Sequence, residues 1–269
     1  MFLFVIFRSF NKIKMRVSAL ASGSSGNCFY VESHDKAVLV DAGISAKQIV
    51  ERIKSVGGEP SRVKGIFVTH EHSDHIRGTD VFARAFNVPI FATKDTARSG
   101  FLCSDSDLIH TIKNNETVKI GKMEIQAFSK SHKCADPVSY NIYNDKKLSI
   151  ITDVGYACKN VIENVSDSDF LFMESNYDER MLASGPYPIF LKNWIKSPQG
   201  HLSNVQSACC VLEHASPKLK NLVLSHISLN NNTPETAFKT FVDLLKERRN
   251  LKPEISVSDR SVPTEMFRI

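Results

Sequence analysis

The sequence predicts a single α/β or α+β sandwich domain. Short apolar strand-like runs alternate with helix-like segments along the whole chain, several strands occur as hairpin-like pairs, and no linker, repeat or long charge block divides it. Of the 269 residues, 42% are hydrophobic and 23% are charged. This composition is typical of a globular domain and excludes a disordered, collagen-like or multi-span membrane chain.

The predicted strands are short apolar runs that end at polar or glycine-containing turns. They cover residues 17–20, 28–32, 37–40, 65–69, 89–92, 118–120, 123–128, 139–143, 148–152, 170–173 and 222–224. The predicted helices cover residues 46–56, 78–86, 205–213 and 234–248. The last of them begins with Pro234 after Thr233, which is a typical helix start.

Residues 1–14 are expected to lie outside the domain, as an N-terminal extension or a misassigned start, which leaves 15–269 as the single domain. Residues 1–7 are apolar, and the cations at positions 8, 12 and 14 follow them. A signal peptide carries its charge before the apolar run, and a bilayer span needs about 20 residues. No stable membrane association is therefore expected.

The net charge and the cysteines give weaker indications about the partner and the cellular location. The net charge of +5 is compatible with an anionic partner but does not demonstrate one. The six cysteines form no Cys-x-x-Cys pair, so we expect free thiols and a cytoplasmic location.

The strongest motif is the segment 70–75, His-Glu-His-Ser-Asp-His, which directly follows the apolar run 65–69. Three histidines and an aspartate within six positions rarely arise from composition alone. His70 and His72 stand two apart at a strand end, so both side chains can point the same way. Asp74 and His75 begin a turn into a helix and can face a second ion. Imidazole and carboxylate groups suit zinc and related divalent ions.

Other ligand-type side chains also follow predicted strands, which places them at one edge of the sandwich. They are Asp41, His132, Asp153 and His226. A single histidine at a strand end is more often an ordinary hydrogen-bonded residue. The combination with the segment 70–75 favours a ligand role, because a two-ion site needs further ligands of these types. The histidines without this setting are interpreted as ordinary ones: His34, His110 and His214.

This set of residues resembles the metallo-β-lactamase superfamily, whose motifs are matched in order over residues 15–269. The resemblance implies an αββα sandwich, with two mixed β-sheets flanked by helices and a two-ion site between the sheet edges. It implies a first ion held by His70, His72 and His132, a second held by Asp74, His75 and His226, and Asp153 as a bridge. Asp41 would hydrogen-bond the ligand loops without binding metal. The ions would be zinc or manganese, with iron also compatible.

The aspartate at position 153 argues against the true β-lactamase branch, which generally has cysteine there, and favours phosphodiester or thioester hydrolysis. The segments 22–28, 174–178, 200–204 and 224–228 are similar to the YycJ/WalJ subfamily, regarded as 5′→3′ DNA exonucleases. The resemblance therefore implies DNA as the partner. A small-molecule hydrolase of the same fold, of thioesterase or lactonase type, is the alternative, and it predicts a narrow apolar pocket. The oligomeric state stays open.

Three residues depart from the subfamily pattern. Asn193 and Trp194 stand where basic residues are expected, and Lys133 replaces a small or acidic residue after His132. None of these changes removes a metal ligand. The first two are expected to weaken contacts with the DNA backbone or to alter the site.

The implied chemistry needs a nucleophile and a proton donor. A water molecule between two divalent ions becomes hydroxide near neutral pH, with Asp74 and Asp153 holding the ions and orienting it. His201 is the candidate general acid, because it precedes a predicted helix N-terminus that Ser203 or Asn204 can cap. The alternative is a capping segment with an exposed histidine.

Candidate substrate contacts come from two further segments. Ser24, Ser25 and Asn27 lie in a Gly-rich loop that could offer N–H and hydroxyl groups to a phosphate, although a plain turn is the alternative. Asn176 could touch the substrate, while Glu174 could instead bond a neighbouring loop. The basic residues at 246–249 are interpreted as solvated charges at a helix end.

Overall fold

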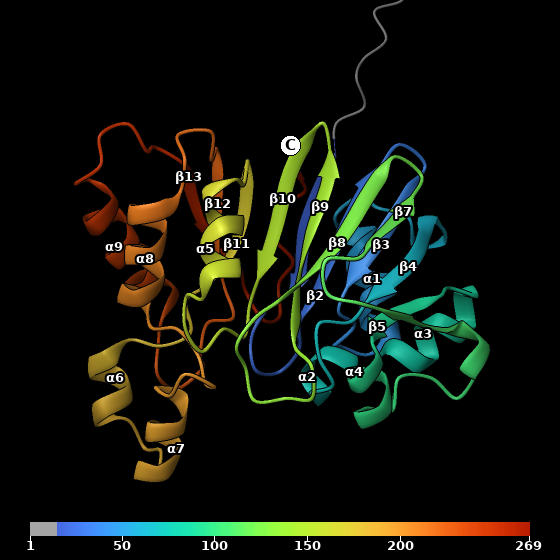
Figure 1. The fold of residues 1–269 in the computed structure, drawn as a ribbon, viewed down its shortest axis with the longest axis horizontal. Coiled ribbons are helices and arrows are strands. Elements are labelled where there is room, and N and C mark those ends of the chain that lie inside the picture. The colour runs from blue at the N-terminus through green and yellow to red at the C-terminus, as the bar shows by residue number, and fades with distance from the viewer. Residues whose placement is uncertain (1–14) are drawn as a thin grey trace, which may run out of the picture.

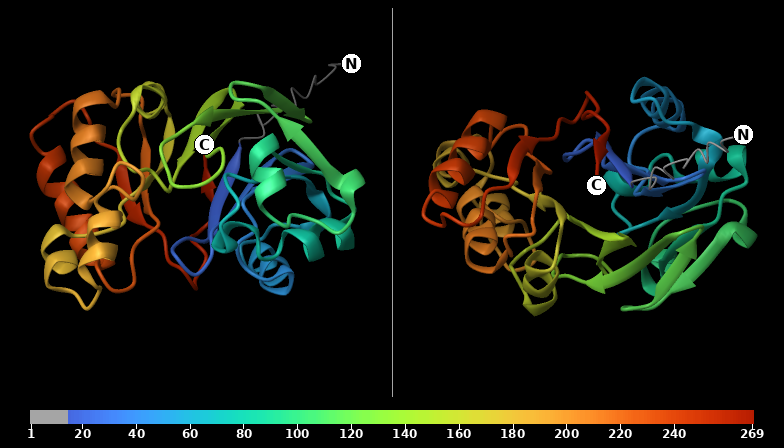
Figure 2. Two further views of the ribbon diagram at one scale, coloured as in Figure 1. Left: turned by 60° about the horizontal axis from the view of Figure 1, so that its bottom comes forward. Right: turned by 90° about the horizontal axis from the view of Figure 1, so that it is seen from above.

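The computed structural model describes residues 15–269, so the prediction for residues 1–14 lies outside the described part of the chain. Two mixed seven-stranded sheets pack face to face, and helices cover both outer surfaces (Figures 1 and 2). The predicted αββα sandwich is confirmed. No helix in residues 15–269 is long and apolar enough to cross a membrane.

The first sheet has the strand order β14-β1-β2-β3-β4-β5-β6. Its strands are β1 (Arg16–Ala21), β2 (Cys28–Ser33), β3 (Lys36–Val40), β4 (Val63–Phe67), β5 (Ile90–Thr93), β6 (Ile109–Ile112) and β14 (Phe267–Arg268). The pairs from β14 to β3 are antiparallel, and those from β3 to β6 are parallel.

The second sheet repeats this arrangement in the order β13-β12-β11-β10-β9-β8-β7. Its strands are β7 (Thr117–Ile120), β8 (Met123–Ser129), β9 (Val138–Asn144), β10 (Lys146–Ile151), β11 (Phe170–Glu174), β12 (Asn221–Ser225) and β13 (Glu254–Val257). The pairs from β7 to β10 are antiparallel, and those from β10 to β13 are parallel.

The helices fall into two outer layers and one projecting pair. On the first sheet and its loops lie α1 (Ala46–Ser55), α2 (Ser73–Ile76), α3 (Thr79–Phe86) and α4 (Lys94–Ser99). On the second lie α5 (Lys159–Ser166), α8 (Asn204–His214) and α9 (Pro234–Leu245). The pair α6 (Glu179–Ser184) and α7 (Ile189–Ile195) projects from the body of the domain beside the strand ends (Figure 1). Short 3₁₀ turns cover Pro60–Arg62 and Ser106–Leu108.

The core forms three apolar layers. Residues between the sheets interlock through aromatic contacts such as Phe29–Phe172, whose ring centroids are 5.0 Å apart. The other two layers lie under α1 and α3 and under α5, α8 and α9. Two of these helices start with capping boxes, at Ser45 and Ser203, so the predicted cap of the helix after residue 203 is confirmed for the serine.

Several elements differ from the sequence-based expectation. The strands without a predicted counterpart, β6, β13 and β14, are edge strands, in which all residues except Ile112 are partly buried or exposed and apolar alternation is weak. The short helices α4, α5, α6 and α7 were also not predicted. Helix α9 ends at Leu245 rather than at residue 248, and the basic residues that follow form turns. No disulfide joins the six cysteines, which all lie within residues 15–269.

Candidate metal centre

The polar side chains of the site gather where strands of both sheets end at their carboxyl termini. Because β3 and β4 run parallel, as do β10, β11 and β12, the residues after them meet at one end of the sandwich. These residues are Asp41 after β3, His70 after β4, His132 after β8, Asp153 after β10, Glu174 at the end of β11 and His226 after β12. The expected convergence of strand ends is therefore observed.

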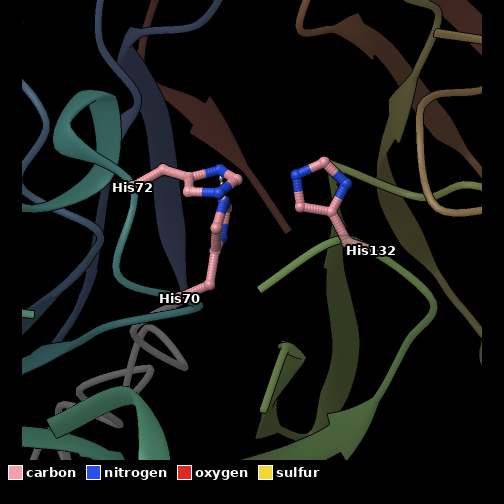
Figure 3. Close-up of side chains that lie close together, drawn as sticks. All are labelled: His70, His72 and His132. Atoms are coloured by element: carbon pink, nitrogen blue, oxygen red, sulfur yellow. Dashed lines mark hydrogen bonds between the residues drawn. The ribbon is translucent and has the colours of Figure 1, made fainter. Parts of the chain in front are cut away.

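Three histidines form the first cluster. The Nε2 atom of His70 lies 3.0 Å from the Nδ1 atom of His72, and both rings face His132 across a gap (Figure 3). The ring centroids of His70 and His132 are 5.0 Å apart. One nitrogen from each ring lies within 4.8 Å of the other two, which is close enough for one ion to contact all three.

A second cluster lies directly beside the first. Asp74, His75 and His226 bring one ligand atom each within 4.8 Å of one another. The Oδ2 atom of Asp153 lies 3.2 Å from His75 Nε2, and its Oδ1 atom lies 3.8 Å from His132 Nε2. Asp153 thus contacts members of both clusters.

Hydrogen bonds behind the rings orient the remaining nitrogens toward the centre. Asp41 Oδ2 lies 2.7 Å from His75 Nδ1, the Gly200 carbonyl lies 3.0 Å from His132 Nδ1, and Glu174 Oε1 lies 2.9 Å from His226 Nδ1. In His132 and His226 the bonded Nδ1 leaves Nε2 as the lone-pair donor, whereas His75 Nε2 also lies 3.1 Å from Asn27 Nδ2. Carboxylate or carbonyl partners of this kind fix the tautomer and orientation of metal-binding histidines.

The buried polar atoms of the site fit a divalent cation. His226 Nε2 and Asp153 Oδ2 are both buried and make no hydrogen bond of acceptable geometry among the described residues, the contact of Oδ2 with His75 Nε2 being an ion-pair distance of 3.2 Å only. Such atoms are rare in folded proteins because losing water without a replacement partner is costly. A cation would satisfy both atoms, and the imidazole and carboxylate donors are those of divalent-metal sites.

The electrostatics of the cluster agree with this donor set. Burial holds the pKa of His70 well below its usual range and lowers the pKa of His132 to about 4, so both rings are neutral ligands at neutral pH. Burial opposes ionisation of Asp153, yet His226 and His75 hold its pKa well below the usual range. Burial disfavours charge on His75 and His226 too, but Asp153 raises the pKa of both rings. The centre therefore combines neutral rings at His70 and His132 with an ionised Asp153 carboxylate and with two rings that this carboxylate holds toward protonation.

The backbone at the site is held in an uncommon conformation. Asp41, Asp153 and His226 have φ angles of 59°, 56° and 57° in the left-handed region, which non-glycine residues adopt rarely and at an energetic cost. Each follows a strand end, where the turn directs the side chain back toward the neighbouring strands. This strain is typical of functional sites.

The loop that carries Asp74 is packed directly against Gly43. A Cβ atom at Gly43 would lie 1.6 Å from the Asp74 carbonyl oxygen, and the Asn27 N–H donates to that oxygen at 2.7 Å. Glycine is therefore required at this close approach of two backbones.

We expect Gly43→Ala to lower the free energy of unfolding by about 3 kcal/mol or more, because backbone must move to admit the methyl group. Chemical denaturation measures the loss. Gly65→Ala is the matched control, since its methyl group would meet only side-chain atoms, at 3.1 Å or farther. Equal losses in the two variants would contradict the close-packing argument.

A pocket of about 240 Å³ opens onto the clusters. Among the predicted substrate residues, Ser24, Asn176 and His201 line it. Ser25 is exposed but is not part of this lining, and Asn27 is completely buried. Asn27 instead places its Nδ2 atom 3.3 Å from Asp74 Oδ2, which supports that loop from behind.

Glu174 connects His201 to the centre. The sequence alone indicates only that Glu174 could bond a neighbouring loop. Its carboxylate is fully buried, lies 2.8 Å from His201 Nδ1, and accepts backbone N–H groups from Asp153, Val154 and Leu202. Burial opposes its ionisation, but the contacts with His201 and His226 lower the pKa of Glu174 to about 2. The available sequence signal was a lone acid at the end of the apolar strand Phe-Leu-Phe-Met-Glu.

Comparison with known proteins agrees with this geometry. The profile of the metallo-beta-lactamase superfamily matches residues 21–131. Exodeoxyribonuclease YycJ of Bacillus anthracis is 34% identical over 261 residues, which cover 94% of this chain and 98% of that protein. The chain belongs to the YycJ/WalJ family. Exodeoxyribonuclease WalJ of Streptococcus pneumoniae is 36% identical over 88% of this chain and 90% of its own length.

The solved structures support the same fold. The metallo-beta-lactamase fold protein YhfI from Bacillus subtilis superimposes with a TM-score of 0.71 at 13% identity, covering 93% of this chain and 99% of that one. At this identity the likeness concerns the fold alone. The predicted membership of the metallo-β-lactamase superfamily and of the YycJ/WalJ family is confirmed.

The three departures from the YycJ/WalJ pattern lie in different surroundings. Trp194 lines the pocket, with its ring centroid 5.6 Å from that of His201 and 6.4 Å from that of His132. Asn193 is exposed and does not line the pocket. Lys133 is exposed and donates its backbone N–H to the Gln199 carbonyl. Only the tryptophan therefore borders the centre.

Proposed function

We propose that this protein is a two-metal phosphodiesterase that removes nucleotides from the 5′ end of DNA. The observation that carries the proposal is the pair of unpartnered buried atoms, His226 Nε2 and Asp153 Oδ2, between two groups of ligand side chains at the floor of a pocket. The exodeoxyribonuclease names of the relatives support DNA as the substrate. Residues 15–269 act as one functional domain, because both sheets contribute ligands.

The proposed ligand assignment follows the two clusters. His70, His72 and His132 would hold the first ion, and Asp74, His75 and His226 the second, with Asp153 within reach of both. Zinc or manganese suits these donors best, and iron is also compatible. When bound, such ions activate a water molecule near neutral pH and stabilise negative charge on phosphoryl oxygens.

The residues of the chain have separate tasks in the proposed reaction. His201, whose Nδ1 is held by Glu174, donates a proton from Nε2 to the leaving oxygen. Asn176 and Ser24 contact the substrate from the pocket wall, and the Asn176 side chain also holds the His226 carbonyl at 3.0 Å. Asp41 orients His75 and takes no part in bond breaking.

The test uses linear DNA labelled at its 5′ end, single-stranded and double-stranded, with manganese and zinc added separately. We expect metal-dependent release of labelled nucleotides by the wild-type protein, and no release by the double variant Asp74→Ala/His75→Ala. No cleavage with either metal, together with turnover of a thioester or lactone, would contradict the DNA proposal and favour a small-molecule hydrolase. The free cysteines support a cytoplasmic setting for this activity.

A further inference from the structure

One side of the pocket is apolar and comes from α7 and the segment that precedes it. Tyr187, Leu191, Trp194 and Ile195 line it beside the histidines and carboxylates. The pocket thus has a charged half suited to a phosphate and an apolar half that the charged chemistry does not use. A substrate that fills both halves must carry an apolar face next to its phosphate.

The apolar surface of α7 continues beyond the pocket. Ile189 and Phe190 are 71% and 72% exposed, which is unusual for large apolar side chains on a short surface helix. Phe190 precedes Trp194 by four residues, so the two side chains lie on the same face, about 6 Å apart along the helix axis. The helix therefore presents two successive aromatic rings that lead away from the centre.

The indole of Trp194 stands close to the atoms proposed to do the chemistry. It packs edge-on against His201, with an interplanar angle of 85°, and lies near His132, a proposed ligand. A phosphate placed at the clusters would bring its attached nucleoside within reach of this ring. Bases stack on aromatic side chains without sequence preference because every base has a π-face.

Resting on the proposed nuclease function, we infer that Trp194 is a stacking platform for the nucleobase next to the scissile phosphate, and that Phe190 extends it to the following base. Stacking on protein requires bases that have left the duplex, and unpairing costs a few kcal/mol per nucleotide. The protein therefore prefers single-stranded or frayed ends. In the YycJ/WalJ pattern a basic residue is expected at position 194, where it would contact the DNA backbone. Trp194 would contact a base instead.

Trp194 is the only tryptophan in the chain, so the intrinsic indole fluorescence reports directly on this ring. The probe is a 5′-phosphorylated single strand with slowly cleaved phosphorothioate linkages, compared with the same strand made abasic at its first two nucleotides. We expect quenching by the normal strand, and binding of the abasic strand weakened by roughly 5- to 100-fold for each stacked base that is removed.

Variants separate stacking from structural damage. Trp194→Ala and Phe190→Ala are expected to weaken binding of the normal strand but to have little effect on the abasic strand, since the partner base is already missing. Trp194→Phe should retain most of the binding, measured by anisotropy of labelled DNA. Phe238→Ala is the matched control, because this half-exposed phenylalanine lies on α9, outside the pocket lining.

Equal binding of normal and abasic strands, or equal losses with both strands in Trp194→Ala, would overturn the inference even if the protein cuts DNA. Quenching that depends on protein concentration without DNA would assign this face to a second copy of the chain and would also overturn it. Selective quenching by the normal strand without any nuclease activity would support stacking and contradict the proposed function instead.

Discussion

Replacing Asp153 with asparagine is expected to reduce nuclease turnover about 10³-fold or more while the fold remains intact. The side chain contacts members of both ligand clusters, and its buried Oδ2 atom has no hydrogen-bond partner within residues 15–269. Loss of several kcal/mol of transition-state stabilisation corresponds to this factor. Asparagine has nearly the same size and tolerates the left-handed conformation at φ 56°, so the turn after β10 should survive.

Metal-dependent thermal stability gives a readout that does not depend on the substrate. At a hundredfold excess over the dissociation constant, a bound ion stabilises the folded state by about 3 kcal/mol. For a domain of this size, that raises the Tm of the wild-type protein by roughly 5–10 °C. Asp153→Asn should lose most of this shift.

Asp169→Asn is the matched control for this substitution. Asp169 is also largely buried, directly before β11, but it bonds Lys146 and the backbone of Lys147 at the opposite end of the strands. This variant should lower the baseline Tm and retain both the metal-induced shift and the activity. If the Tm of Asp153→Asn rose with metal as much as that of the wild-type protein, Asp153 would not be shared between the two clusters.

The convergence of the candidate ligand residues was predictable because these residues follow a local rule that the chain obeys repeatedly. Strand patterns mark where apolar runs end, and parallel neighbours bring those ends together, so the sequence alone places Asp153 and His226 near the segment 70–75. The αββα arrangement itself depended on the family resemblance. Strand patterns alone left open how the two sheets pair.

Other parts of the site depend on contacts between distant residues that no local pattern encodes. Glu174 bonds His201 and His226 only because β11 lies beside β12 and the segment before α8 folds over both. Asn27 was expected at the substrate, yet its completely buried position behind Asp74 results from the close approach of two loops at Gly43. The short helices α6 and α7 are too short for a 3.6-residue period to be distinguished. Their apolar residues could not be separated from core residues.

Replacing His201 with alanine is expected to slow DNA cleavage by about 10²- to 10⁴-fold, the usual contribution of a positioned general acid. The ring lies largely buried in the pocket wall, and Glu174 holds its Nδ1 atom at 2.8 Å, so Nε2 is left to serve the leaving oxygen. A purely structural histidine would give a similar loss on DNA. The substrate must therefore separate the two roles.

A phosphodiester with a p-nitrophenolate leaving group provides that separation, because this group departs without a proton. His201→Ala should lose far less activity on p-nitrophenyl phosphodiesters than on DNA, whereas Asp153→Asn should lose activity on both. Glu174→Gln should lose activity on both substrates, with a further loss on DNA, because the carboxylate orients the proposed ligand His226 as well as His201. Equal losses of His201→Ala on both substrates would assign His201 to binding or structure, since only proton donation makes the defect depend on the leaving group.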